Sequence, residues 1–185
     1  DSDAVRSPRN WIHGANANLP PDISLSWVLP VGQDFHARFS AQARRYRYVI
    51  YNDPVRPAHL AHEVTWNYRP LDIERMRAAA KVLVGTHDFT SYRAVGCQAK
   101  SPIKTIHHLE LLEFGRFIVL DIRANAFLHH MVRNIAGVLM QIGCGEHPVG
   151  WAAQVLAARD RAQGGLTAPA YGLYLVDVTY PAHFD

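Results

Sequence analysis

The chain has 185 residues, of which 49% are hydrophobic, and it carries a formal net charge of +3. This length suits one domain, or one domain and part of another, with enough apolar residues for a buried core. Two cysteines, Cys97 and Cys144, are too few for a disulfide framework, which excludes the small disulfide-rich secreted proteins. No apolar run is long enough to cross a membrane and no signal peptide is visible, so we expect a soluble cytoplasmic protein.

The basic residues are mostly arginine. Among the 19 basic residues, only Lys81, Lys100 and Lys104 are lysines. Guanidinium groups bind phosphates through two hydrogen bonds and stack on bases, so this bias is compatible with nucleic-acid binding. A GC-rich genome that favours arginine codons explains the same bias at least as well, so composition leaves the partner open.

Helix-like and strand-like stretches occur along the whole chain. The opening thirty or so residues are too few to form a core alone. The predicted elements are, in order, a helix over Trp11–Asn18, a turn at Leu19–Asp22, a strand over Ile23–Val28, a loop at 35–39, a strand over Ala43–Tyr51, a helix from Asp72 to Gly85, a loop at Gly96–Pro102, strands over Thr105–Glu113 and Arg116–Arg123, helices over Met131–Ile142 and Trp151–Arg161, and a strand over Gly172–Tyr180. This order predicts an α+β fold with a mostly antiparallel sheet and helices on one face.

The stretch Ala124–Asn134 leads from a strand into the predicted helix that ends at Ile142. Apolar residues nearly surround this helix, so we expect it to lie deep in the fold. Arg133 is out of place in its first turn, near the positive end of the helix dipole. A buried or half-buried Arg needs a carboxylate or phosphate partner, and positions 129–137 hold no Asp or Glu. The partner is either a distant structural acid or a group from a ligand or another chain, and both remain open.

Eleven histidines invite a metal-binding interpretation, which their spacing does not support. The neighbours in His107–His108 and in His129–His130 point in different directions on a strand or helix. The sequence has no His-Glu-x-x-His, no Cys-x-x-Cys and no Gly-x-Ser-x-Gly motif. We therefore predict neither a metal site nor a nucleophilic triad.

Basic and aromatic residues alternate in Arg44–Tyr48. On a strand this pattern suits RNA, because a ring can stack on a base while guanidiniums hold phosphates. The other interpretation is an edge strand with solvated arginines and one core Tyr, which this segment alone favours. Together with Arg133 and the 35–39 loop, the pattern favours an RNA-binding strand over a solvated edge strand.

Six stretches carry a resemblance to a known family: Asn16–Pro20, Phe35–Ala41, Arg44–Tyr48, His87–Tyr92, Asn125–Asn134 and Gly172–Leu175. Their order and spacing are similar to those of the TruA family of tRNA pseudouridine synthases along the whole chain, which argues against a chance match. The resemblance implies an enzyme that isomerises uridine to pseudouridine on the 3′ side of the anticodon stem-loop of tRNA (tRNA positions 38–40). It implies a homodimer with tRNA as its partner and with no metal or organic cofactor.

The resemblance also implies a fold of the pseudouridine synthase catalytic-domain type. Residues 1–32 would then be the remainder of an N-terminal α/β domain, and residues 33–185 a C-terminal α/β domain. By position, Tyr46 resembles the active-site Tyr that stacks on the target base, and Arg133 resembles the Arg that pairs with the nucleophilic Asp. Leu173 resembles the apolar wall of the uracil pocket, and Val132 belongs to the same substrate-binding set. The implied tRNA contacts are Arg6, Phe35, His36, Ala37, Arg38, Phe39, Arg44, Gly96, Cys97, Gln98, Ala99 and Lys100.

One departure from the family concerns the nucleophile. The family's Asp lies in a Gly-Arg-Thr-Asp-Ala-Gly-Val-His motif, which is absent from the 185 residues. We therefore expect the chain alone to be inactive. Two other interpretations stay open: a non-catalytic RNA-binding module, and a purely structural piece of the enzyme. The first explains the Arg and Tyr strand, but it explains an isolated Arg in an apolar helix only if the partner is structural.

Overall fold

The computed structural model describes residues 4–184 of the chain. They fold as two compact units: one is Ala41–Pro181, and the other joins the N-terminal residues up to Ser40 with those from Ala182 onward. The larger unit holds the sheet and the helices α2, α3 and α4, while the smaller unit holds α1.

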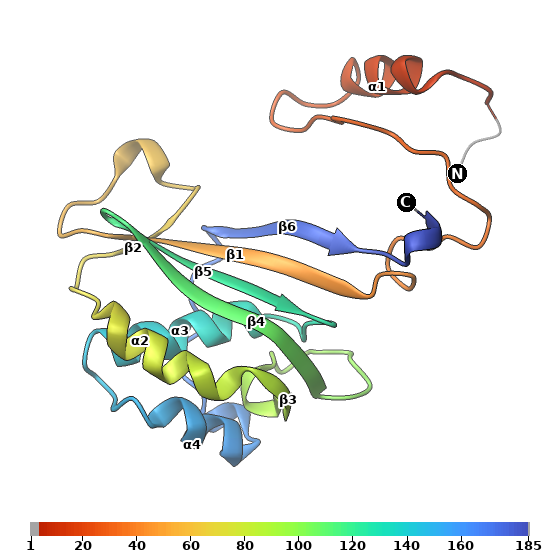
Figure 1. The fold of residues 1–185 in the computed structure, drawn as a ribbon. Coiled ribbons are helices and arrows are strands. Elements are labelled where there is room, and N and C mark those ends of the chain that lie inside the picture. The colour runs from red at the N-terminus through yellow and green to blue at the C-terminus, as the bar shows by residue number, and fades with distance from the viewer. Residues whose placement is uncertain (1–3, 185) are drawn as a thin grey trace. The chain divides into compact units, whose positions relative to one another are not determined.

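The larger unit is built on an open sheet of six strands (Figure 1). Neighbouring strands follow the order β2-β1-β5-β4-β3, and β6 also pairs with β1. The pairing is antiparallel except between β1 and β2, which confirms a mostly antiparallel sheet. The strands are β1 (Ala43–Asn52), β2 (Thr65–Asn67), β3 (Gly85–Asp88), β4 (Ile103–Phe114), β5 (Phe117–Ala124) and β6 (Leu173–Thr179).

Three helices lie on one face of this sheet (Figure 1), which confirms the predicted α+β fold. They are α2 (Ile73–Ala80), α3 (Met131–Gly143) and α4 (Trp151–Ala158). The core between the two layers includes Tyr48 and Ile50 of β1, Leu120 of β5 and most of α3, which is buried on nearly all sides as predicted. Short 3-10 turns occur at Ala58–Leu60, Lys81–Leu83, Thr90–Tyr92, Arg161–Gln163 and Ala182–Phe184.

Two predicted helices of this unit end earlier than expected. A 3-10 turn follows α2, and Gly85, the expected helix end, instead begins β3 with a φ of +108°. The helix α4 ends at Ala158 because Arg159 adopts the left-handed conformation. The sequence does not predict β2 and β3, because strands this short show no usable alternation. The predicted hairpin of β4 and β5 around Gly115 is confirmed.

In the smaller unit, α1 spans Pro8–Asn16 and begins before the predicted start at Trp11. Ser7 explains the earlier start, because its hydroxyl accepts a hydrogen bond from the N–H of Asn10 at 3.3 Å. Pro8 suits the first turn because its fixed φ is compatible with a helix and it lacks an N–H to satisfy.

The predicted strand over Ile23–Val28 is wrong. These residues are irregular and pair with no strand in the described part of the chain. The backbone of Leu25 bonds to a side chain instead: its N–H donates to Asn16 Oδ1 at 2.7 Å, and its C=O accepts from Asn16 Nδ2 at 3.0 Å. A single amide therefore satisfies backbone groups that a neighbouring strand would otherwise have bonded.

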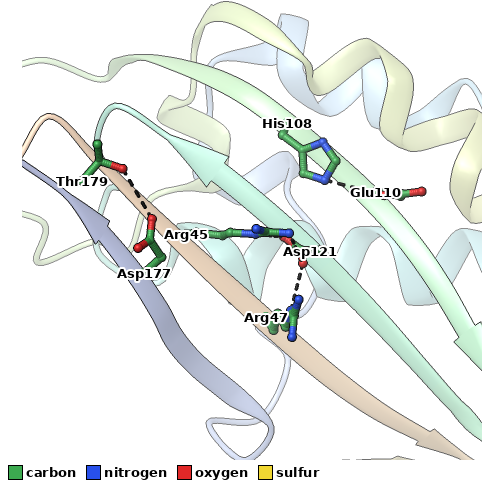
Figure 2. A network of polar contacts seen from close by, with 7 residues as sticks. All are labelled: Arg45, Arg47, His108, Glu110, Asp121, Asp177 and Thr179. Carbon is green, nitrogen blue, oxygen red and sulfur yellow. Dashed lines mark hydrogen bonds and ion pairs between the residues drawn. The ribbon is translucent and has the colours of Figure 1, made fainter. Parts of the chain in front are cut away.

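On the sheet face opposite the helices, a buried carboxylate joins two arginines (Figure 2). The side chain of Asp121 on β5 is 1% exposed. It accepts bonds from Arg45 Nε at 2.6 Å, Arg45 Nη2 at 2.9 Å and Arg47 Nε at 2.9 Å. Burial alone would raise the pKa of the Asp121 carboxyl, but the two guanidiniums outweigh burial and hold that pKa below its ordinary value.

We expect Asp121→Asn to lower the free energy of unfolding at neutral pH by about 1–2 kcal/mol, since both arginines are partly exposed and screened. Because the folded pKa is depressed, this stability is present above the unfolded pKa of about 4 and is lost as the pH falls through the folded value. Urea unfolding across that range should show the two proteins converging at low pH. Glu110→Gln, on the same face, is the control and should change stability little. A constant difference at every pH would contradict the charge argument.

Candidate active site

A cavity of about 360 Å³ lies in the larger unit at the N-terminal end of α3. It contains all four residues to which the family resemblance gives a role in catalysis or base binding. Its walls come from three parts of the chain: β1, the turn that leads into α3 with the first turn of that helix, and the segment from Ala170 to the start of β6. The lining residues are Tyr46, Phe127, Leu128, His129, His130, Met131, Val132, Arg133, Ala170 and Leu173.

The alternation of β1 places Tyr46 in this cavity. Tyr46 lies on the same strand face as Tyr48 and Ile50, which are fully buried, but it is only half-buried. Its ring packs edge-on against Phe127, with ring centroids 5.1 Å apart and an angle of 88° between the planes. No hydrogen-bond partner for the Tyr46 hydroxyl is found among residues 4–184. The hydroxyl is therefore free to bond to a molecule in the cavity.

Tyr48, two residues on, has a different role. Its hydroxyl bonds to Thr65 Oγ1 and donates to the carbonyl of Pro169 at 2.9 Å. Burial raises the pKa of Tyr48 to about 12. A buried and bonded phenol of this kind supports the fold and cannot exchange protons easily near neutral pH.

Arg133 extends from the first turn of α3 and is half-buried. Its Nε donates to the carbonyl of Ala168 at 2.7 Å, and the N–H of Ala168 donates to the carbonyl of Arg133 at 3.2 Å. Within residues 4–184, no carboxylate lies within ion-pair distance of this guanidinium. A half-buried cation at the wall of a cavity is suited to bind an anionic group there.

A polar network fixes the segment that holds Arg133. The buried amide of Asn134 donates to the carbonyl of Tyr92 at 2.7 Å and accepts from the hydroxyl of Thr167 at 2.7 Å. Arg161 donates to Thr167 Oγ1 at 3.0 Å and to the carbonyl of Gly165 at 3.0 Å. These bonds cross-link the 161–167 segment to α3, and this segment leads directly to Ala168.

The structure places the predicted RNA-binding loop at Gly96–Lys100 beside the cavity. Cys97 Sγ accepts a bond from the N–H of His129 at 3.3 Å, and the N–H of Ala94 donates to the carbonyl of His129 at 2.9 Å. Burial tends to raise the pKa of the Cys97 thiol, but backbone N–H groups of Ala99 and His129 and nearby cations outweigh it and lower that pKa. Gly96, Gln98 and Lys100 are exposed, so these three residues are accessible to a macromolecule.

The other predicted RNA contacts lie elsewhere. Arg44 is half-buried, and its Nη1 donates to the carbonyls of Ala41 at 3.0 Å and Asn125 at 3.1 Å. The remaining contacts belong to the smaller unit, where Arg6 lies over the ring of Trp11 at 5.6 Å. In the 35–39 loop of that unit, Phe35 is half-buried and His36, Ala37, Arg38 and Phe39 are exposed.

The RNA interpretation of Arg44–Tyr48 does not hold for two of its arginines. As the alternation of the strand predicts, Arg45 and Arg47 lie on the face opposite Tyr46, and there both bind Asp121 (Figure 2). A strand alternates its side chains, so these arginines cannot hold the phosphate of a nucleotide whose base stacks on Tyr46. The edge-strand alternative is also wrong, because β1 lies between β5 and β6.

Sequence reasoning missed several groups in and around the cavity. The carbonyl of Ala168, which accepts from Arg133, carries no sequence signal, since every residue has a carbonyl. His129 and His130 were considered only as a metal pair, whereas both line the cavity. Within residues 4–184, no group of three or more His, Cys, Asp or Glu side chains is arranged to hold a metal ion. In the same residues, no helix has the length and apolar character needed to span a membrane.

Comparisons with known proteins agree on one family. A family model described as tRNA pseudouridine synthase matches residues 79–181. The chain is 70% identical over 185 residues to tRNA pseudouridine synthase A of Pseudomonas aeruginosa, covering 100% of this chain and 65% of that protein. It is 60% identical over 184 residues to the protein of the same name from Alcanivorax borkumensis, covering 100% and 69% of the two chains. For the protein of that name from Pectobacterium atrosepticum the identity is 58% over 181 residues, with 98% and 64% covered. The chain thus spans about two thirds of the length of these curated relatives.

Proposed function

Because the chain belongs to the tRNA pseudouridine synthase family, we propose that its cavity is the uridine-binding part of an active site that converts uridine to pseudouridine in the anticodon stem-loop of tRNA. The observation that carries the proposal is the convergence of Tyr46, Val132, Arg133 and Leu173 on one cavity. An aromatic ring, two apolar walls and a cation suit a flat, partly apolar base next to a negatively charged group.

The target uridine must first leave the base stack, which costs a few kcal/mol when it is paired. Stacking on Tyr46 and enclosure between Val132 and Leu173 offset part of this cost. Arg133 pairs with the nucleophilic Asp of the intact enzyme and keeps it ionised, since an opposite charge within about 4–6 Å lowers a carboxyl pKa by about 1–3 units. After the base has rejoined the sugar through carbon, the free Tyr46 hydroxyl accepts or relays the proton that leaves this carbon.

A hybrid synthase provides the test. In the hybrid, these 185 residues replace the matching residues of the Pseudomonas aeruginosa relative. We expect the hybrid to release tritium from tRNA that carries 5-tritiated uridine, and the 185-residue chain alone to release none, because it contains no Gly-Arg-Thr-Asp motif. Turnover by the chain alone would contradict the assignment of the nucleophile. A folded hybrid that binds tRNA without turnover would favour the non-catalytic RNA-binding module.

The two tyrosines of β1 should respond differently to the loss of a hydroxyl. In the hybrid, we expect Tyr46→Phe to lower kcat roughly tenfold or more, because it removes a proton relay. Tyr48→Phe should instead lower stability by about 1–2 kcal/mol, because it removes the buried hydroxyl that bonds to Thr65 and to the carbonyl of Pro169. Single-turnover rates and thermal unfolding of both variants provide the measurement. A larger loss of rate with Tyr48→Phe would mean that the roles are reversed.

The resemblance extends the proposal to the assembly. A homodimer that acts in the cytoplasm on tRNA, without a metal or organic cofactor, completes the proposed function. The loops at 35–39 and 96–100, together with Arg6 and Arg44, are its proposed tRNA contacts.

A further inference from the structure

We propose that His130 is a specificity residue of the cavity, whose imidazole hydrogen-bonds the polar edge of the pyrimidine base. The inference rests on the proposed function of the cavity and adds to it a residue that distinguishes one pyrimidine base from another. It is carried by the position of His130, its backbone conformation and its free ring nitrogens.

The side chain of His130 is half-buried and lines the same cavity as Tyr46 and Arg133. It makes no hydrogen bond to the start of α3, and within residues 4–184 neither ring nitrogen has a protein hydrogen-bond partner. The ring packs at a tilt against that of His129, with centroids 3.9 Å apart and 38° between the planes, which restricts its orientation. An oriented imidazole with both nitrogens free can bond to a bound molecule.

The backbone of His130 is in the left-handed region, with φ 61° and ψ 7°. This conformation is costly for a residue with a Cβ, and such strain is concentrated at functional sites. Arg159 is the other residue with a side chain and a positive φ in the described chain, at 50°. Its conformation has an ordinary explanation, because a left-handed residue commonly ends a helix. His130 precedes a helix, where the capping residue normally has an extended backbone and bonds to the helix through its side chain.

The charges around His130 decide whether its side chain is suited to bind a neutral base or an anionic group. Burial, the guanidiniums of Arg133 and Arg161, and the neighbouring His129 all lower the pKa of His130, with burial the largest effect. A neutral imidazole offers one donor and one acceptor. Uracil presents alternating acceptors and a donor along its polar edge, so a neutral imidazole can either donate to a carbonyl oxygen or accept from the ring N–H. Arg133 is the better partner for an anion.

The test uses the 185-residue chain and the variant His130→Gly. Gly adopts a positive φ without strain, so the variant should unfold at the same temperature as the wild type or higher. We expect its affinity for uridine 5′-monophosphate, measured by NMR titration, to fall about tenfold or more, together with its preference over cytidine 5′-monophosphate. Arg159→Gly relieves the same kind of strain outside the cavity and should leave both quantities unchanged.

The resonances of Tyr46 and Leu173 separate the possible outcomes. If they shift with the nucleotide and His130→Gly binds as tightly and as selectively as the wild type, the role of His130 is overturned and the proposed function stands. If they do not shift in the wild-type chain, the proposed function of the cavity fails, and the inference with it. If His130→Gly is poorly folded, His130→Asn decides: Asn tolerates the left-handed region and keeps a donor and an acceptor. Retention of the uridine preference by His130→Asn supports base reading, and its loss in a folded protein overturns it.

Discussion

Replacing Arg133 by Ala in the hybrid synthase should lower kcat/KM about 100-fold or more while leaving the affinity for tRNA nearly unchanged. The guanidinium is half-buried at the cavity wall and has no carboxylate partner within residues 4–184. In the proposed function its partner is the nucleophilic Asp. Removing one member of a buried ion pair costs about 3–5 kcal/mol, and each 1.36 kcal/mol is a factor of about ten in rate.

Two further variants make this prediction specific. Arg133→Lys keeps the charge but loses the planar fork and the bond to Ala168, so it should recover only part of the activity. Arg116→Ala removes an exposed cation that pairs with Asp53 at 3.0 Å outside the cavity, and it should leave kcat/KM unchanged. Steady-state kinetics and tRNA binding provide the measurements. If binding and turnover fall equally in Arg133→Ala, Arg133 is an RNA contact and not the partner of the Asp.

We expect Gly137→Ala to destabilise the larger unit by about 3 kcal/mol or more. A Cβ at position 137 would lie 1.8 Å from the carbonyl oxygen of Leu166 and 3.4 Å from the backbone nitrogen of Ala168. Both neighbours are main-chain atoms in a segment that α3 and Arg161 hold in place, so they cannot move aside cheaply. The helix and this segment can therefore approach so closely only because position 137 has no side chain.

The matched control for this substitution is Gly150→Ala. Gly150 precedes α4 with φ −67° and ψ −9°, and a Cβ there meets nothing within 4 Å. Its free energy of unfolding should change by less than about 0.5 kcal/mol. Chemical unfolding of both variants gives the comparison. Equal stability of the two would show that the Leu166–Ala168 segment yields easily, which would also weaken the view that Arg133 is rigidly held.

The sequence predicts best those elements whose pattern is local. The alternation of β1 and of the hairpin, and the almost wholly apolar surface of α3, each follow from neighbouring residues. The four cavity residues were assigned through the family resemblance, and their convergence depends on pairing between distant parts of the chain. Strand alternation also predicts that Arg45 and Arg47 lie on the face opposite Tyr46. It does not predict that both bind Asp121, because Asp121 lies far away in the sequence.

Other features have no local signal. The left-handed backbone of His130 and the carbonyl of Ala168 are set by tertiary packing and not by residue type. The predicted strand over Ile23–Val28 failed for a related reason. Alternating residues form a strand only when a partner strand is available, and here the Asn16 side chain bonds to the backbone of Leu25.

The way Arg133 is held has a consequence for sequence variation. Ala168 contributes only main-chain atoms, its C=O and its N–H, to the two bonds with Arg133. The requirement at position 168 is therefore one of size, since the residue is only 5% exposed. Gly or Ser at this position would present the same carbonyl. Position 168 can therefore hold other small residues without loss of the two main-chain bonds to Arg133. Position 137 cannot vary in this way, because any side chain there would meet the backbone of Leu166.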